Sequence, residues 1–146
     1  MPTADPGGVY VASVADAHVT RAHETPEERW GDIVTWRTLI SGDRMPTEGL
    51  TVGIAEIQPG APTEGGRHRH EPPEVYYFLS GAATVEIDGS EHLAEAGTAV
   101  FVPGGAWHQV TNTGTEPVRL LYAFAVDGFD QVRYERPGPD PRPTPG

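Results

Sequence analysis

Hydrophobic and polar side chains alternate along much of this chain in short runs. In residues 118–126 the alternation places five apolar side chains on one face, namely Val118, Leu120, Tyr122, Phe124 and Val126. Successive side chains of a β-strand point to opposite faces, so this run predicts a strand that lines an apolar interior. Residues 33–41 alternate in the same way, whereas residues 50–57 are apolar on both faces. A strand of the second kind is expected between the core and another sheet or subunit, and it predicts a homodimer.

Further short runs rich in β-branched and aromatic residues predict more strands. They cover residues 75–79, 82–87, 92–94, 98–102 and 107–112, with further candidates at 9–14 and 132–134. Asp88-Gly89 is a strong hairpin signal, because both central positions of a type I′ turn need positive φ. Residues 24–30 carry Pro and acids ahead of a bulky side chain, which predicts at most one helical turn. Strands at intervals of about ten residues are typical of a sandwich or barrel.

The composition favours the same fold class. Eighteen Gly and 15 Pro among 146 residues supply many tight turns, and the length suits one hydrophobic core. We therefore predict an all-β, single-domain jelly-roll β-barrel. Its expected bounds are residues 9–134, between a flexible N-terminal tail at 1–8 and a disordered, Pro-rich C-terminal tail at 135–146.

Charge and hydropathy exclude several classes of protein. The formal net charge of -11 gives no basic face for a nucleic acid. No stretch approaches the ~20 consecutive apolar residues of a membrane span, and residues 1–13 carry no basic leader. We expect a cytoplasmic protein with no nucleic-acid or membrane partner. Because the chain has no Cys, any metal must be held by His, Asp or Glu.

One stretch concentrates residues that bind metals. His68 and His70 are two residues apart, so on a strand their side chains leave the same face about 7 Å apart, twice the rise per residue. Glu74 continues that face if the strand survives Pro72-Pro73, and His108 would come from a neighbouring strand. Two other interpretations stay open: a chance grouping of surface side chains, and a metal that only stabilises the fold.

The two segments resemble the paired motifs of the cupin superfamily. The first motif, G-x5-H-x-H-x3,4-E-x6-G, is matched by His68, His70, Glu74 and Gly81. The second motif, G-x5-P-x-G-x2-H-x3-N, is matched by Gly97, Pro103, Gly105, His108 and Asn112. The opening Gly of the first motif would fall on Pro62, which concerns the loop leading into the motif.

The resemblance implies a cupin jelly-roll β-barrel with one divalent transition metal, Fe, Mn, Ni or Zn. The implied ligands are His68, His70, Glu74 and His108, which leave one or two coordination positions for water, O2 or substrate. Ligand type alone does not identify the metal.

Other candidate site residues follow from their parity with these ligands. Tyr76 shares a face with Glu74, and we regard both as candidate catalytic residues; Tyr76 could donate a proton, bind substrate or simply pack. The expected walls of a substrate pocket are Trp36, Phe78, Tyr122 and Phe124, although the same pattern is typical of a plain core.

Three functions remain on the sequence alone. The favoured one is a dioxygenase acting on a small, aromatic or carbonyl-bearing metabolite, resembling the small quercetinase-like cupins. The first alternative is a non-redox cyclase, isomerase or lyase of secondary metabolism, resembling the cupin polyketide cyclases and the cupin dimethylsulfoniopropionate lyases. The second alternative is a cupin that binds a small molecule without catalysis.

Overall fold

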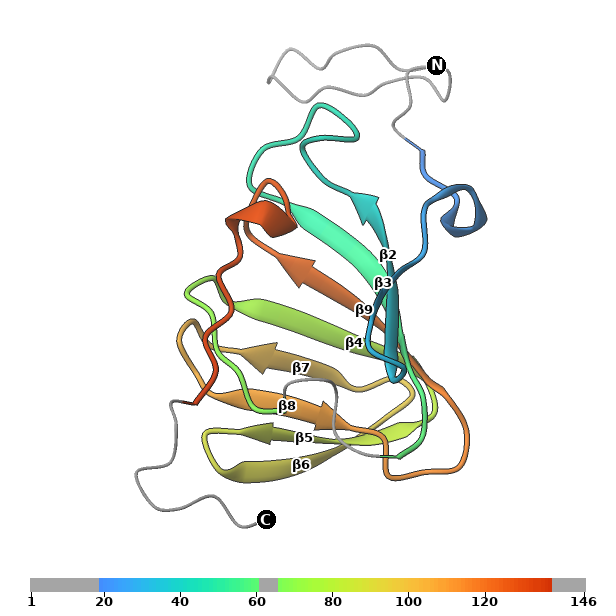
Figure 1. The fold of residues 1–146 in the computed structure, drawn as a ribbon, viewed down its shortest axis with the longest axis vertical. Coiled ribbons are helices and arrows are strands. Elements are labelled where there is room, and N and C mark those ends of the chain that lie inside the picture. Colours follow the sequence, from blue (N-terminus) through green and yellow to red (C-terminus); the bar gives the residue numbers. More distant parts are fainter. Residues whose placement is uncertain (1–18, 61–65, 138–146) are drawn as a thin grey trace.

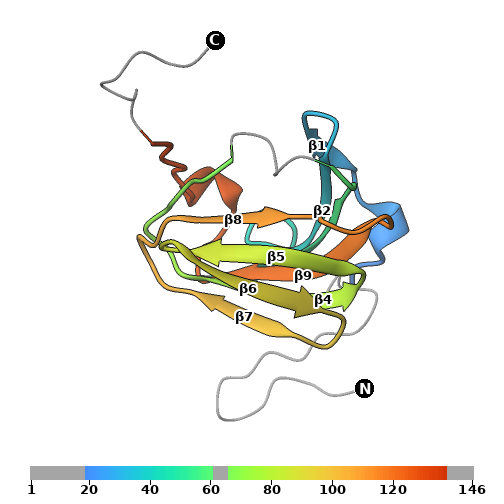
Figure 2. The same cartoon turned by 90° about the horizontal axis from the view of Figure 1, so that it is seen from below.

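Two antiparallel β-sheets enclose the core of the protein (Figure 1). The computed structural model describes residues 19–60 and 66–137. The larger sheet has the strand order β1-β2-β3-β9-β4-β7, and the smaller one has the order β6-β5-β8. Viewed from below, the smaller sheet lies over β9, β4 and β7 (Figure 2), and buried apolar side chains of both sheets form one cluster. The prediction of an all-β jelly roll is confirmed.

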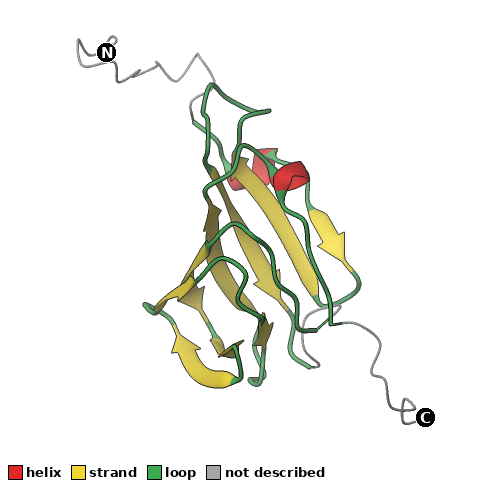
Figure 3. Ribbon diagram, turned by 90° about the vertical axis from the view of Figure 1, so that its left-hand side faces the viewer, coloured by secondary structure: helices red, strands yellow, loops and turns green. Residues whose placement is uncertain are grey.

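The strands lie close to where the sequence predicts them. The larger sheet contains β1 (Glu28–Trp30), β2 (Val34–Ile40), β3 (Thr51–Ile57), β9 (Val118–Phe124), β4 (Glu74–Ser80) and β7 (Ala99–Val102). The smaller sheet contains β6 (Ser90–Glu95), β5 (Ala82–Ile87) and β8 (His108–Thr111). The helical content of the described residues is confined to two 3₁₀ turns, η2 (Ala22–Glu24) and η3 (Phe129–Gln131), as Figure 3 shows in red.

Side-chain parity sorts each strand into an inner and an outer face. Along β4, Glu74, Tyr76 and Phe78 are buried, whereas Val75 and Tyr77 are about two-fifths exposed. The inner face of β9 is buried from Val118 to Phe124 with the same period of two. Glu74 thus enters the core because it shares the parity of two aromatic residues, and its neighbours on β9 are apolar.

The hairpin between β5 and β6 forms at the predicted turn. Asp88 has φ of 46° and Gly89 has φ of 89°, so both central positions are left-handed, as a type I′ turn requires. This turn also contacts the candidate site, because the Asp88 carboxylate accepts a hydrogen bond of 2.9 Å from the backbone N–H of Trp107.

The structure departs from the sequence prediction in three places. Residues 24–30, expected to form at most a helical turn, hold the end of η2 and all of β1, because β1 pairs with β2 from Glu28↔Trp36 to Trp30↔Val34. Residues 132–134, a candidate closing strand, form no strand. Of the stretch assigned to a disordered tail, Glu135 is instead bridged to Arg69.

Several predictions fall outside the described residues, namely the tail at 1–8, the strand at 9–14 and most of the Pro-rich tail, at 138–146. Within residues 19–60 and 66–137, no helix has the length and apolar character needed to cross a bilayer.

Candidate metal centre

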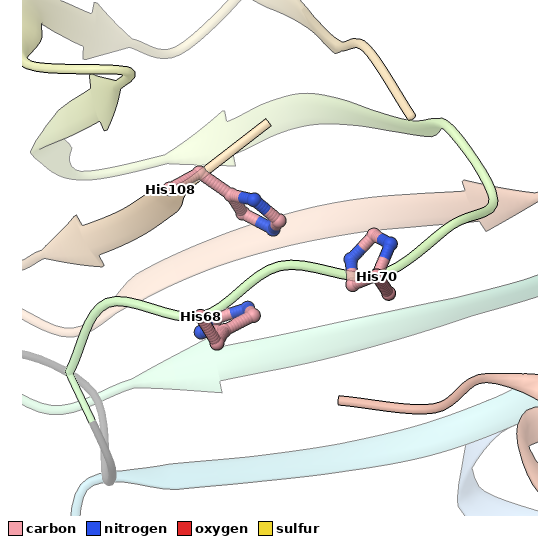
Figure 4. Close-up of side chains that lie close together, drawn as sticks. All are labelled: His68, His70 and His108. Carbon is pink, nitrogen blue, oxygen red and sulfur yellow. The ribbon is translucent and has the colours of Figure 1, made fainter. Parts of the chain in front are cut away.

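The candidate ligands converge from three segments of the chain. His68 and His70 lie on the irregular segment before β4, Glu74 opens β4 and His108 opens β8. The segment is irregular because Pro72 and Pro73 have no N–H with which to continue a ladder. His68 and His108 nevertheless pair, through backbone hydrogen bonds of 3.0 Å and 2.8 Å, and Figure 4 shows the three imidazoles turned toward one another.

Each imidazole has its Nδ1 atom occupied by a nearby backbone carbonyl. His68 donates to Gly66 at 3.0 Å, His70 to Pro72 at 2.7 Å and His108 to Ala106 at 2.8 Å. A hydrogen bond at Nδ1 fixes the tautomer and leaves Nε2 as the metal-binding atom. The backbone around each ligand therefore prepares its ring for coordination.

The free nitrogens and the Glu74 carboxylate gather at one point. One ring nitrogen from each of the three histidines lies within 4.8 Å of the others. Glu74 Oε1 lies 3.2 Å from His70 Nε2 and 3.6 Å from His108 Nε2. His108 Nε2 is buried with no hydrogen-bond partner, which is costly unless another group uses its lone pair. These donors fit a divalent transition metal.

The pKa values of the candidate ligands in the metal-free chain reflect their burial and the charge of the Glu74 carboxylate. Burial, followed by the nearby His108, lowers the pKa of His68 to about 4. Burial also acts to lower the pKa of His70, but its hydrogen bond to Glu74 and the charge of that carboxylate outweigh burial, so the pKa is raised. Burial acts to raise the pKa of Glu74, yet the neighbouring imidazoles of His108 and His70 lower it. Glu74 is therefore ionised and attracts a cation.

A cavity of about 340 Å³ opens beside the ligands. His68, Glu74 and Tyr76 lie at its metal-binding end. The remaining lining is apolar or aromatic: Trp30, Val34, Trp36, Ala55, Ile57, Val110, Leu120, Tyr122, Phe129, Val132 and Tyr134. A site of this kind suits a small ligand with an apolar body and one polar end that faces the metal.

The walls of this cavity differ in part from the sequence prediction. Trp36 and Tyr122 line it as expected, but Phe78 and Phe124 do not. Phe78 is fully buried in the core, and Phe124 packs edge-on against His70, with ring centroids 5.2 Å apart. Parity places a side chain on the inner face, but the neighbouring strands decide whether it meets the cavity or the core. The functional roles assigned to these residues stay predictions.

Sequence reasoning missed three aromatic residues of the cavity. Trp30 comes from β1, Phe129 from η3 and Tyr134 from the chain that follows. None belongs to a long alternating run, and they reach the cavity only through tertiary packing. The Phe-x4-Tyr spacing after the last strand was a weak signal, since bulky aromatics in a polar segment need a surface to cover.

Comparison with known proteins agrees with the motifs. Residues 53–124 match the family model for the cupin domain. The chain is 43% identical over 101 residues to the dimethylsulfoniopropionate lyase DddW of Ruegeria pomeroyi, a match that spans 69% of this chain and 64% of the lyase. The chain thus spans somewhat less than two thirds of that relative's length.

Solved structures share the architecture. An RmlC-like cupin from Shewanella frigidimarina superposes with a TM-score of 0.65 and 22% identity, over 77% of this chain and 94% of that one. A predicted oxalate decarboxylase from Thermotoga maritima gives a TM-score of 0.65 at 25% identity, over 74% of this chain and 98% of that one. These likenesses establish the fold.

Proposed function

This chain belongs to the cupin superfamily, and on that premise we propose that it is a metal-dependent lyase acting on a small β-sulfonium carboxylate such as dimethylsulfoniopropionate. The observation that carries the proposal is one cavity that has Glu74, Tyr76 and one of the three clustered histidines, His68, at its end, while apolar and aromatic side chains form the rest. The 43% identity to a lyase named for that substrate supports the same choice.

The reaction requires a proton acceptor and an environment for the leaving group. The carbon next to the carboxylate loses a proton, the electron pair forms the C=C bond, and the C–S bond breaks with its pair going to sulfur. The products are acrylate and dimethyl sulfide. The residues that would hold the metal are His68, His70, Glu74 and His108. A divalent metal bound there would act as a Lewis acid on the substrate carboxylate.

Tyr76 is the candidate that moves the proton, at its Oη atom. Burial, followed by the charge of Glu74, raises the pKa of Tyr76 well above its ordinary value. Pairing of Glu74 with a cation removes the second of these causes, so Tyr76 gives up its own proton more readily in the loaded protein. To act as a general base, the Oη atom first passes its own proton to solvent and then accepts the substrate proton.

The aromatic walls suit the sulfonium group of the substrate. Trp30, Trp36 and Tyr134 line the cavity, and the face of an aromatic ring attracts a cation within about 6 Å. A dimethylsulfonium group combines a positive charge with methyl groups, so it gains from both cation–π contact and apolar burial. An uncharged isopropyl group of similar shape lacks the first contribution.

The direct test measures dimethyl sulfide in the headspace and acrylate in solution, with purified protein and each of the four metals in turn. We expect both products in equal amounts, and their loss in His108→Ala. If no metal supports release of either product above the rate in buffer, the lyase proposal is wrong.

The dioxygenase favoured by the sequence remains a prediction, and the same samples test it. Oxygen consumption in step with substrate loss, without sulfide release, would support a dioxygenase instead. Saturable substrate binding with neither reaction would support the binding protein that the sequence left as its last alternative.

A further inference from the structure

The segment after β9 returns across the cavity. We call residues 126–137 the C-terminal strap; in Figure 1 it runs from η3 down past the ends of the strands. At its start Phe129 packs on Trp36 and Tyr122, with ring centroids 6.0 Å and 5.3 Å apart. Toward its end Tyr134 and Arg136 lie over Trp30. The strap therefore contacts the cavity from β2 to the metal-binding end.

Tyr134 is the part of the C-terminal strap that meets the metal ligands. Its ring centroid lies 5.3 Å from that of His68 and 5.3 Å from that of His70, and both contacts are edge-on. A third edge contact joins it to Trp30 at 6.0 Å. Because Tyr134 is 37% exposed and also lines the cavity, its ring lies between the ligands and solvent and covers the metal-binding end of the cavity.

Arg69, the residue between His68 and His70, holds the Tyr134 ring in place. Arg69 and Glu135 exchange two backbone hydrogen bonds, of 3.0 Å and 2.8 Å. The Arg69 Nε atom also donates to the Glu135 carboxylate at 2.9 Å. The same guanidinium lies 4.6 Å from the ring centroid of Trp107, the residue before His108. One side chain thus joins the strap to both segments that supply histidine ligands.

A second contact lies just beyond Tyr134 in the chain. The Arg136 guanidinium lies 4.2 Å from the centre of the Trp30 ring, within the range of a cation–π contact. The two residues that follow Tyr134 directly, Glu135 and Arg136, are therefore both anchored. Neighbouring residues of an extended chain point to opposite faces, so anchoring Glu135 and Arg136 fixes the direction of Tyr134.

We propose that Tyr134 is a specificity-determining residue that limits the size of the group bound beside the metal ligands, and that Arg69 and Glu135 are positioning residues that hold its ring there. The statement about substrate size rests on the proposed lyase function, whereas the statement about positioning does not. The two parts are therefore tested by different measurements.

The test of size compares Tyr134→Ala with Tyr134→Phe, on dimethylsulfoniopropionate and its diethyl analogue. The wild-type protein should prefer the dimethyl compound in kcat/KM, and Tyr134→Ala should reduce that preference by about tenfold or more, the usual effect of one or two methylene groups in a fitted pocket. Tyr134→Phe keeps the ring and should keep the preference. An unchanged preference in Tyr134→Ala would overturn the specificity role.

The test of positioning uses hydrogen exchange in the metal-free protein and needs no activity. Glu135→Gln should speed exchange of the amides of residues 132–136 by several fold, and the reversed pair Arg69→Glu/Glu135→Arg should restore protection. The matched control is Glu56→Gln, which breaks a comparably exposed pair with Arg119 on the sheet. Equal exchange in Glu135→Gln and the wild-type protein would overturn the positioning role.

The two measurements separate the proposals from each other. Faster exchange in Glu135→Gln together with no sulfide release from the wild-type protein would uphold the positioning role and refute the lyase. Sulfide release with unchanged exchange would uphold the lyase and refute the positioning role.

Discussion

The Nε2 atom of His70 and the Oε1 atom of Glu74 lie 3.2 Å apart inside the protein, and both side chains are almost fully buried. The other nitrogen of His70 already donates to Pro72, so a proton on Nε2 makes this imidazole a cation paired with Glu74. The raised pKa of His70 extends the pH range over which this pair exists in the metal-free chain. Within that range, metal binding must release the proton of His70.

Replacing His70 should remove the metal without unfolding the protein. His70→Gln loses one ligand and the charge interaction with Glu74, so we expect metal content below about a tenth of the wild-type value, with a folded circular dichroism spectrum. Elemental analysis measures the first and thermal melting the second. His92→Gln is the control, since His92 is exposed on β6 and should retain the metal. A collapse of the melting temperature in His70→Gln would indicate a structural metal instead.

The metal-free protein should become less stable as the pH falls through the range set by His68. The pKa of His68 is about 4 in the fold against 6.5 in the unfolded chain, so the unfolded state binds more protons between these values. Stability contributed by the neutral ring is complete above about pH 6.5 and is lost on the way to pH 4, up to about 3 kcal/mol. Denaturant titrations of wild type and His68→Gln test this, and parallel pH profiles would contradict it.

The fraction of metal retained by the protein should also decrease as the pH falls. His68, His70 and His108 bind metal only as neutral rings, and Glu74 raises the pKa of His70, so protons compete with the metal first at His70. We expect metal loss as the pH is lowered toward about 5. Dialysis at a series of pH values followed by elemental analysis measures it. Full metal content at about pH 4.5 would show that protons do not compete.

Tyr76→Phe should separate proton transfer from metal binding. The variant keeps the ring and loses only the hydroxyl, so metal content should match the wild-type protein. If Tyr76 is the general base, the rate of elimination should fall by about 10² or more. Tyr77→Phe, altered on the outer face of the same strand, is the control and should keep the full rate. Equal rates in Tyr76→Phe and wild type would assign the proton to another group.

Gly53→Ala should narrow the cavity at the wall formed by Tyr122. A Cβ atom at Gly53 would overlap the Tyr122 hydroxyl and the ring carbon that bears it, and also the backbone oxygen of Arg37 on β2, so both the Tyr122 ring and β2 must shift. We expect a destabilisation of about 1–3 kcal/mol and weaker binding of substrate. Glu56→Gln, on the outer face of the same strand and outside the cavity lining, is the control and should keep the wild-type KM. Unchanged KM in Gly53→Ala would show that Tyr122 adapts without narrowing the cavity.

We propose that the outer face of the larger sheet joins two copies of the chain. Val75 and Phe101 are register partners on β4 and β7, and Tyr77 lies beside them; all three are substantially exposed. Apolar patches of this kind mark interaction surfaces. Light scattering should give a dimer at micromolar concentration, and Phe101→Arg should give a monomer. A monomeric wild-type protein would refute the proposal.

The sequence predicts this fold well where the period of two is long. The inner faces of β9 and β4 and the Asp88-Gly89 turn could be predicted from neighbouring residues in the sequence alone. The histidines were found because their spacing is local too, and the glutamate because it keeps their parity. Trp30 and Tyr134 were missed because each depends on a short or irregular segment whose place is set by contacts across the fold.

The metal ligands and Tyr134, which covers them, are added to the chain at different times during translation. Tyr134 follows His108 by 26 residues, the difference of their numbers, and translation at ~5–20 residues per second needs on the order of seconds to add them. All four ligands therefore leave the ribosome before the residue that covers them. Tyr134 also follows β9, which lies between β3 and β4 in the larger sheet, so the C-terminal strap is the last of the described segments to be added over the ligands.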